Sequence, residues 1–257
     1  MARNGSKTYK RVIAPWVLPL LLIGSWQVLS SFGIIPENFL PAPTEIVASG
    51  VGLVQSGEML THIQVSFSRA ITGFLIGGGI GLVLGILNGI FPIAENHLDT
   101  SIQMFRNIPH LALIPLVILW LGIGEEAKIF LVAIGVFFPI YINTYYGIKS
   151  VDKDLIEMGR VYGLPKNKLL VRVILKGALP SVLVGVRYSL GIMWLTLIVA
   201  ETIAADAGIG YLAMNAREFM QIEVVIVAIL LYAILGKLAD SAAKLLESRL
   251  LKWNVNY

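Results

Sequence analysis

Residues 71–91 read ITGFLIGGGIGLVLGILNGIF, an uncharged run that decides the fold class. A helix needs about 20 apolar residues to cross the hydrocarbon core of a bilayer, so this run is long enough for one crossing. The composition agrees, because 56% of the 257 residues are hydrophobic and only 14% are charged. So little charge could not cover the surface of a soluble domain of this length. The sequence therefore predicts an all-α integral membrane protein.

Five other segments extend this pattern, so about six transmembrane helices are expected. They are residues 14–32, 108–121, 128–146, 182–203 and 222–238. The third span, at 108–121, is short and carries Pro109 and Pro115, which interrupt the hydrogen bonding that a bilayer demands of a helix. The first follows a basic start, as a signal peptide does, but it is longer than a signal core and no clear A-x-A cleavage site follows. An uncleaved first span is therefore expected.

The basic residues predict that both ends of the chain lie in the cytoplasm. With six spans and an inner N-terminus, sixteen of the 20 lysines and arginines lie inside, and Arg187 lies within a span. Only Arg69, Lys128 and Arg217 lie outside. The positive-inside rule favours this orientation.

The expected organisation has three parts and two outer segments. Residues 1–59 hold a cytoplasmic N-terminus, the first span and an outer interfacial segment. Residues 60–241 form the transmembrane domain, with a cytoplasmic loop at about 150–178, and residues 242–257 form a cytoplasmic tail. The outer segment at 41–61 reads as one amphipathic helix, and that at 201–221 as a turn at Gly208 and Gly210 before a short helix.

Glycines recur at every fourth position of the deciding run. They are Gly73, Gly77, Gly81, Gly85 and Gly89. In lipid this spacing clears one face of a helix, so that another backbone can approach closely. The partner helix belongs either to the same chain, which we favour, or to a second copy.

The longest connection, residues 147–180, is polar and holds seven of the 20 basic residues. Residues 152–162 read as a helix with Asp152 as its N-cap. Gly163 suits the left-handed residue that closes a helix, and residues 166–176 read as a second, amphipathic helix. Such a pair is either a docking element or a basic loop that only sets topology.

Three residues of the span at 182–203 are candidates for a translocation path. Arg187 lies about 8 Å along the helix from its inner end, where snorkelling to the interface explains it better than a pathway. Trp194 lies in the middle, and core packing is the favoured explanation there. Glu201 caps the outer end, where it can touch water.

Several kinds of chemistry have no counterpart in the sequence. It has no cysteine, no G-x-x-x-x-G-K-[ST] loop, and three histidines without metal-ligand spacing. We therefore expect no catalytic residue, no metal site and no cofactor bound by this chain. A membrane protein of this kind has no energy source of its own.

At residue 157 the long loop resembles the EAA motif of ABC importer permeases, the signature of the helix that couples to the ATPase. Glu157-Met158-Gly159 and, three residues later, Gly163 match the motif, with Met158 and Gly159 in place of its two alanines. The resemblance implies a coupling loop. Its residues are Asp152, Asp154, Glu157, Met158, Gly159, Gly163, Leu164 and Pro165.

The resemblance continues through most of the chain. The family pattern ends its motif with I-x-L-P, whereas Lys176 stands in place of that proline, and Ala178-Leu179-Pro180 is expected to supply the turn. Residues 107–120, 138–143 and 185–240 are similar to the aliphatic sulfonate permease branch, which is related to the taurine and nitrate permeases.

What this resemblance implies is a type I, binding-protein-dependent importer in the bacterial cell membrane. Two permease copies, as a homodimer, would form the pathway, and two ATPase subunits holding ATP and magnesium would bind the inner loops. A soluble binding protein would deliver the substrate, an aliphatic sulfonate or a related small anion. No nucleic-acid partner is expected.

Two other functions would require features that differ from these. A secondary transporter would need ionisable residues inside the membrane and an inverted repeat with broken helices in both halves, and the sequence suggests neither. A membrane enzyme would need a nucleophile, a base or metal ligands in one place, and none is evident.

Overall fold

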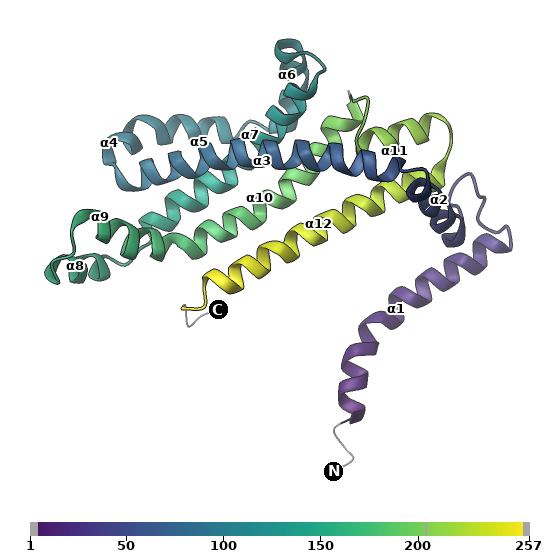
Figure 1. Ribbon diagram of the computed structural model, residues 1–257, viewed down its shortest axis with the longest axis horizontal. Helices are drawn as coiled ribbons and strands as arrows, with labels where there is room; N and C mark the ends of the chain where they lie inside the picture. The colour runs from purple at the N-terminus through teal and green to yellow at the C-terminus, as the bar shows by residue number, and fades with distance from the viewer. Residues whose placement is uncertain (1–4, 204, 254–257) are drawn as a thin grey trace. The chain divides into compact units, whose positions relative to one another are not determined.

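The computed structural model describes residues 5–203 and 205–253, with side chains from Pro15 onward. Within these ranges every regular element is helical (Figure 1). The α-helices are α1 (Gly5–Ser31), α2 (Pro43–Gln55), α3 (Glu58–Ile90), α4 (Pro92–Ala94), α5 (Thr100–Arg106), α6 (Ile114–Leu121), α7 (Glu125–Lys149), α8 (Lys153–Val161), α9 (Lys166–Leu169), α10 (Lys176–Ile203), α11 (Ile209–Glu218) and α12 (Ile222–Leu250). Shorter elements are the π-turns η1 (Glu95–Asp99) and η3 (Leu170–Leu175) and the 3₁₀ turn η2 (His110–Leu113).

Four helices of the described residues are long and apolar enough to cross a membrane. They are Glu58–Ile90, Glu125–Lys149, Lys166–Ile203 and Ile222–Leu250. A fifth crossing is available if the bent pair Pro92–Arg106 and His110–Leu121 counts as one span. The prediction of an all-α membrane protein is therefore confirmed. The sixth span stays a prediction, because the described apolar part of α1, Pro15–Ser31, is about 25 Å long at 1.5 Å per residue.

The chain divides into two compact units, which are described separately. The first holds residues 1–61 and 212–230. In it, the Thr44 amide donates to Gln27 Oε1 over 3.1 Å and joins α2 to α1. Gly57, with a φ of +77°, separates α2 from α3. The prediction of one helix over 41–61 is wrong. The left-handed conformation of Gly57 separates α2 from α3, which begins at Glu58.

The second unit, residues 62–211 and 231–257, is built on the close contact of α3 and α7. All five glycines at the predicted spacing face α7 of the same chain. A Cβ built on Gly73 would lie 2.6 Å from Val132 Cγ1, and one on Gly81 would lie 2.6 Å from the Phe137 carbonyl oxygen. The two backbones are thus closer than any larger residue would allow.

The predicted third span is the second part of a bent helix pair, which we call the broken span. A helical stretch, Pro92–Arg106, precedes it, and the chain then bends by 83° before His110–Leu121 (Figure 1). Pro109 lies at the bend, where its ring cannot continue the helix. The prolines were expected to interrupt the helix, and Pro109 does so. The preceding helix was not predicted, because its charged and polar residues lower its hydropathy: Glu95, His97, Asp99 and Arg106.

Two predictions for residues 166–180 are also wrong. Residues 166–176 do not form a separate helix, because Lys166–Ile203 is continuous through the π-turn η3. Pro180 accordingly lies inside α10 and makes no turn. The helix that holds the last predicted span extends beyond residue 238, since α12 continues to Leu250. The N-terminal residues 1–4 and the end of the predicted tail, 254–257, lie outside the described residues.

Candidate functional site

The helix pair that follows α7 forms the first candidate site, which we call the coupling hairpin (residues 152–176). Asp152 caps α8, and its Oδ1 accepts the Asp154 amide over 2.9 Å, as the sequence predicts. Gly163 has a φ of +74°, the left-handed conformation expected of it, and Leu164-Pro165 leads into α9. Both ends of α8 are therefore set by local signals.

The outward side of α8 is apolar and open to solvent. Leu155 and Met158 are about half exposed, and Val161 and Tyr162 are 86% and 79% exposed. Beside them lies a groove of about 450 Å³ that continues to Trp253. Glu157 is exposed and forms no ion pair with another described side chain. An unpaired acid beside exposed apolar groups is typical of a surface that another protein covers.

The other side of α8 holds the hairpin to the membrane helices. Gly159 is buried, and a Cβ there would lie 2.6 Å from Leu169 Cδ1, so α8 rests directly on α9. Ile156 packs on a buried cluster formed by Ile148, Val151 and Ala178. A displacement of α8 would thus reach α7 and α10 through close-packed side chains.

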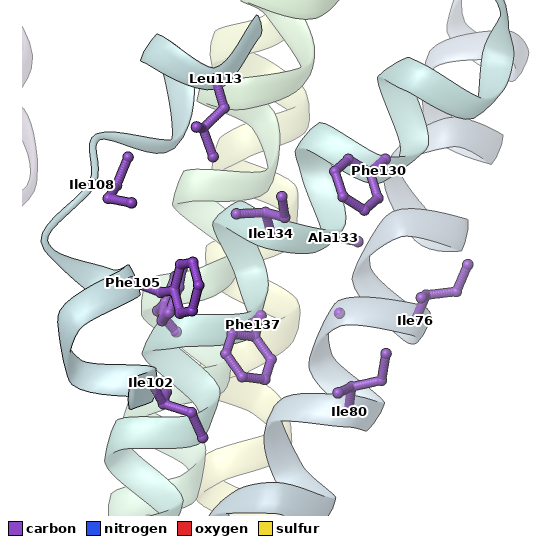
Figure 2. Close-up of a pocket in the computed structure, with 12 residues that line it drawn as sticks. Ile76, Ile80, Ile102, Phe105, Ile108, Leu113, Phe130, Ala133, Ile134 and Phe137 are labelled. Carbon is purple, nitrogen blue, oxygen red and sulfur yellow. The ribbon is translucent and has the colours of Figure 1, made fainter. Parts of the chain in front are cut away.

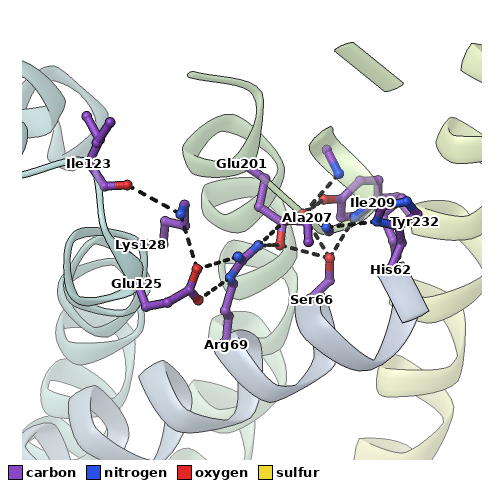
Figure 3. A network of polar contacts seen from close by, with 12 residues as sticks. His62, Ser66, Arg69, Ile123, Glu125, Lys128, Glu201, Ala207, Ile209 and Tyr232 are labelled. Carbon is purple, nitrogen blue, oxygen red and sulfur yellow. Dashed lines mark hydrogen bonds and ion pairs between the residues drawn. The ribbon is translucent and has the colours of Figure 1, made fainter. Parts of the chain in front are cut away.

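A buried polar network forms the second candidate site (Figure 3). Glu201 on α10 is 1% exposed, and it accepts hydrogen bonds from Ser66 Oγ at 2.8 Å and Tyr232 Oη at 2.9 Å. Arg69 Nη1 lies 2.7 Å from Glu201 Oε1, while its Nε and Nη2 each lie 2.5 Å from the carboxylate of Glu125. The prediction that Glu201 touches water is wrong, because α3, α11 and α12 enclose it.

The same network holds the turn before α11. Three consecutive amides, those of Gly208, Ile209 and Gly210, donate to His62 Nδ1, Ser66 Oγ and Glu201 Oε2 over 3.1, 2.8 and 2.9 Å. These are amides at the start of a helix, which have no partner within it. The short helix and the turn at Gly208 are confirmed, whereas Gly210, predicted in the turn, lies in the first turn of α11. A carboxylate at this helix start is electrostatically favourable.

Two cations that the sequence assigns to the outer side, Arg69 and Lys128, are buried in the chain. Arg69 and Lys128 are each 4% exposed and lie within helices α3 and α7. Lys128 Nζ approaches Glu125 Oε1 at 3.3 Å. Two of the long apolar helices thus carry buried charged side chains near one end. Sequence reasoning missed Arg69 because α3 begins at Glu58, thirteen residues before the apolar run.

The remaining pathway candidates have partners or packing of their own. Arg187 Nε lies 2.7 Å from Asp240 Oδ1 on α12, so this arginine is paired inside the chain. Trp194 is 6% exposed, and its ring meets Tyr232 edge-on with centroids 6.1 Å apart. Its indole nitrogen has no hydrogen-bond partner. The structure does not bring Arg187 into the network of Glu201, whereas Tyr232 links Trp194 to it.

An apolar groove of about 440 Å³ lies between α3, α5 and α7 (Figure 2). Ile76 and Ile80 line it from α3, Phe105 from α5, and Phe130 and Phe137 from α7. No charged residue lines it, so this groove cannot hold an anion by charge. Sequence reasoning could not find it, because the groove depends on the bend of the broken span. Among the described residues, no cluster of His, Asp or Glu could hold a metal ion.

Comparisons with known proteins agree with this architecture. Residues 77–252 match the family described as "Binding-protein-dependent transport system inner membrane component". The chain is 59% identical over 245 residues to a putative aliphatic sulfonates transport permease protein, SsuC, of Escherichia coli, covering 95% of this chain and 93% of the relative. It is 47% identical to the protein of the same name in Bacillus subtilis, over 94% of this chain and 87% of that one.

More distant matches include a second permease and a solved transporter structure. The taurine transport system permease protein TauC of Escherichia coli is 32% identical over 91% of this chain and 87% of its own. A crystal structure of an amino acid ABC transporter has a TM-score of 0.62 at 16% identity, covering 77% of this chain and 97% of that one, and shows the fold alone. The chain therefore belongs to the family of permease subunits of binding-protein-dependent ABC importers, and it is a multi-pass membrane protein with the type I importer fold.

Proposed function

We propose that this permease carries aliphatic sulfonates into the cell and receives its driving force through the coupling hairpin. The observation that carries the proposal is the two-sided α8: Val161 and Tyr162 are exposed on it, while Ile156 is packed on the cluster of Ile148, Val151 and Ala178. A partner on the exposed side could thus move the membrane helices on the other. The relatives named for aliphatic sulfonates support the substrate class.

The assembly we propose has two copies of this permease, two ATPase subunits and one binding protein. ATP and magnesium belong to the ATPase subunits, and this chain binds neither. Both ends of the permease lie in the cytoplasm of a bacterial cell, with the hairpin on the same side. The positive-inside distribution of lysine and arginine supports this orientation.

The coupling residues are assigned roles in this proposal according to their places in the hairpin. Asp152 and Gly163 set the length of α8, Gly159 lets α9 approach, and Glu157 and Met158 face the ATPase. Three residues of the hairpin remain. Asp154 lies in the first turn of α8, and Leu164 and Pro165 form the connection from α8 to α9. ATP-driven closure of the ATPase pair would move α8, and the packed cluster would pass that movement to α7 and α10.

The five glycines are proposed to join helices, whereas the pathway candidates are proposed to support the pathway or contact the substrate. Gly73, Gly77, Gly81, Gly85 and Gly89 join α3 to α7, so that the two helices move as one body. Trp194 and Glu201 are buried in the chain, so they do not contact substrate. They hold the helices of the pathway in place through packing and hydrogen bonds. Arg187, about two-fifths exposed, remains the candidate to meet an anionic substrate.

The experiment is uptake of a labelled alkanesulfonate into proteoliposomes that contain the permease, its ATPase subunit and the binding protein. Uptake should require ATP and the binding protein and should persist when proton and sodium gradients are dissipated. Taurine and nitrate serve as competitors that test the substrate class. Uptake driven by an ion gradient without ATP would contradict the proposal and favour the secondary transporter.

A further inference from the structure

Two carboxylates face two tyrosines at the end of α7 that leads into the coupling hairpin. Tyr145 Oη donates to Glu95 Oε1 over 2.6 Å, and Tyr141 Oη donates to Asp99 Oδ1 over 2.6 Å. Both acids lie on η1, the π-turn within the first half of the broken span. Both pairs are spaced by four residues, so each pair lies on one face of its helix.

Further contacts fix these pairs to α3 and to the last turn of α7. Asn88 Nδ2 on α3 donates to Tyr141 Oη over 2.7 Å, and Asn88 and Tyr141 are both fully buried. Lys149 Nζ lies 2.5 Å from Glu95 Oε2. We call this group of side chains the tyrosine–carboxylate cluster. Its members are Asn88, Glu95, Asp99, Tyr141, Tyr145 and Lys149.

The cluster lies between the coupling hairpin and the bend of the broken span. Lys149 is three residues before Asp152, the N-cap of α8. Asp99 is eight residues before the bend at Asn107–Pro109. Beyond the bend, His110 Nε2 forms a hydrogen bond with Thr196 Oγ1 on α10 over 3.0 Å. The first half of the broken span is thus held to α7. The second half packs on both α7 and α10, because Ile114 and Val117 share a buried cluster with Leu131 of α7 and Ala200 of α10.

This arrangement gives the cluster a mechanical consequence. If α7 and α10 shift relative to each other, the first half of the broken span follows α7, whereas the second half is also held by α10, so the bend must change. A π-turn is a common site of such local adjustment, and η1 carries both acids. Without the cluster, the first half would be held only by packing and by its chain connection to α3.

We propose that Glu95 and Asp99 are positioning residues that lock the first half of the broken span onto α7, so that movement of the coupling hairpin reaches the bend. This inference rests on the proposed function and assigns residues to it that no part of the coupling motif contains. The acids touch no substrate. They act through Tyr141, Tyr145 and Lys149.

The test uses the complete transporter in proteoliposomes and measures alkanesulfonate uptake and ATP hydrolysis in the same sample. Glu95→Gln and Tyr145→Phe should each leave hydrolysis near the wild-type rate while uptake per ATP falls about tenfold, the factor expected for a lost hydrogen bond to a charged group. The double variant should fall no further than Glu95→Gln alone, because that change already weakens the contact that Tyr145→Phe removes. Glu126→Gln, which removes an exposed acid from α7, should leave the ratio unchanged.

A distance measurement separates positioning from simple loss of folding. The chain has no cysteine, so spin labels attach only to the two cysteines that are introduced, Met104→Cys on α5 and Lys153→Cys on α8. The label-to-label distance should be narrowly distributed in the parent in each nucleotide state. It should broaden in the Glu95→Gln, Asp99→Asn variant.

Three results would count against these claims in different ways. If the distance broadens but uptake per ATP is unchanged, the cluster holds the helix without transmitting movement, and the inference is wrong. If hydrolysis and uptake fall together in Tyr145→Phe along with thermal stability, the cluster is only structural, and the inference is again wrong. If the wild-type transporter shows no ATP-driven uptake, the proposed function fails, and this inference fails with it.

Discussion

At the scale of single residues, the second unit depends on buried charges that neutralise one another. Glu201 and Arg69 are almost fully buried, and each is held by several partners from different helices. Charges so deeply buried are tolerated only when they are paired and hydrogen-bonded. Removing one partner leaves the other charge stranded in a medium of low polarity.

Arg69→Met should therefore destabilise the protein strongly. The free energy of unfolding is expected to fall by about 3–5 kcal/mol, the usual cost of breaking a buried pair from one side. Glu126→Gln, at an exposed position, should change it by less than about 0.5 kcal/mol. Thermal unfolding of the detergent-solubilised proteins, followed by circular dichroism, gives the comparison. Equal midpoints for the two variants would show that the network carries little of the stability.

Gly163 and Gly191 form a matched pair for the backbone of the coupling hairpin. A Cβ at either residue would meet no atom within 4 Å, but only Gly163 has a positive φ. Gly163→Ala should therefore cost about 1–2 kcal/mol at the end of α8. Gly191→Ala, inside α10, should be neutral or stabilising by up to about 1 kcal/mol. Limited trypsin digestion at Arg160 and Lys166 should accelerate in the first variant only, and equal rates would argue against a conformational role for Gly163.

At the scale of elements, the contact between α3 and α7 is set by which glycines face the neighbouring backbone. A Cβ on Gly81 would lie 2.6 Å from the Phe137 carbonyl oxygen, whereas one on Gly79 would meet nothing within 4 Å. A methyl group at Gly81 has no room unless α7 moves away. The same methyl group at Gly79 points into open space.

Gly81→Ala should accordingly separate the two helices and lower the thermal midpoint, with a cost of about 1–3 kcal/mol for overpacking. Gly79→Ala should match or exceed wild-type stability, since alanine is the better helix former. The measurement is the unfolding midpoint of each purified variant in the same detergent. A lower midpoint for Gly79→Ala than for Gly81→Ala would reverse the assignment of the packed face.

How far the sequence predicts the structure depends on whether its signals are local. Asp152 and Gly163 could be assigned in advance, because an N-cap and a left-handed glycine act through neighbouring atoms. The apolar runs and the glycine spacing likewise predict helices and a packed face. The EAA-like residues predict the site's position, and the family match agrees with the resemblance.

The parts that could not be predicted depend on contacts between distant residues. Arg69 and Glu201 are 132 residues apart, and nothing near either one signals the pairing. The broken span was only half recognised, because its first half carries acids whose partners, Tyr141 and Tyr145, are more than 40 residues away. The charged residues of that segment suggest a loop, because the sequence does not show that the two tyrosines donate hydrogen bonds to its acids.

At the scale of the whole molecule, the chain is a permease whose sequence carries no nucleotide-binding loop of the P-loop type. The family assignment explains that absence, because an ABC permease works with a separate nucleotide-hydrolysing subunit. The coupling hairpin has an exposed apolar face, which we propose the ATPase subunit covers, and its other side packs against α7 and α10. The central claim is therefore a physical contact between α8 and the ATPase.

Site-directed cross-linking tests this contact most directly. Met158→Cys introduces a single thiol on the exposed face of α8 in a chain that has no other cysteine. Tyr188→Cys, on α10 and 65% exposed, is the matched control. In the assembled transporter, a short thiol-to-lysine cross-linker should join Met158→Cys to the ATPase subunit and leave Tyr188→Cys uncoupled from it. Cross-linking at Tyr188→Cys but not at Met158→Cys would contradict the account.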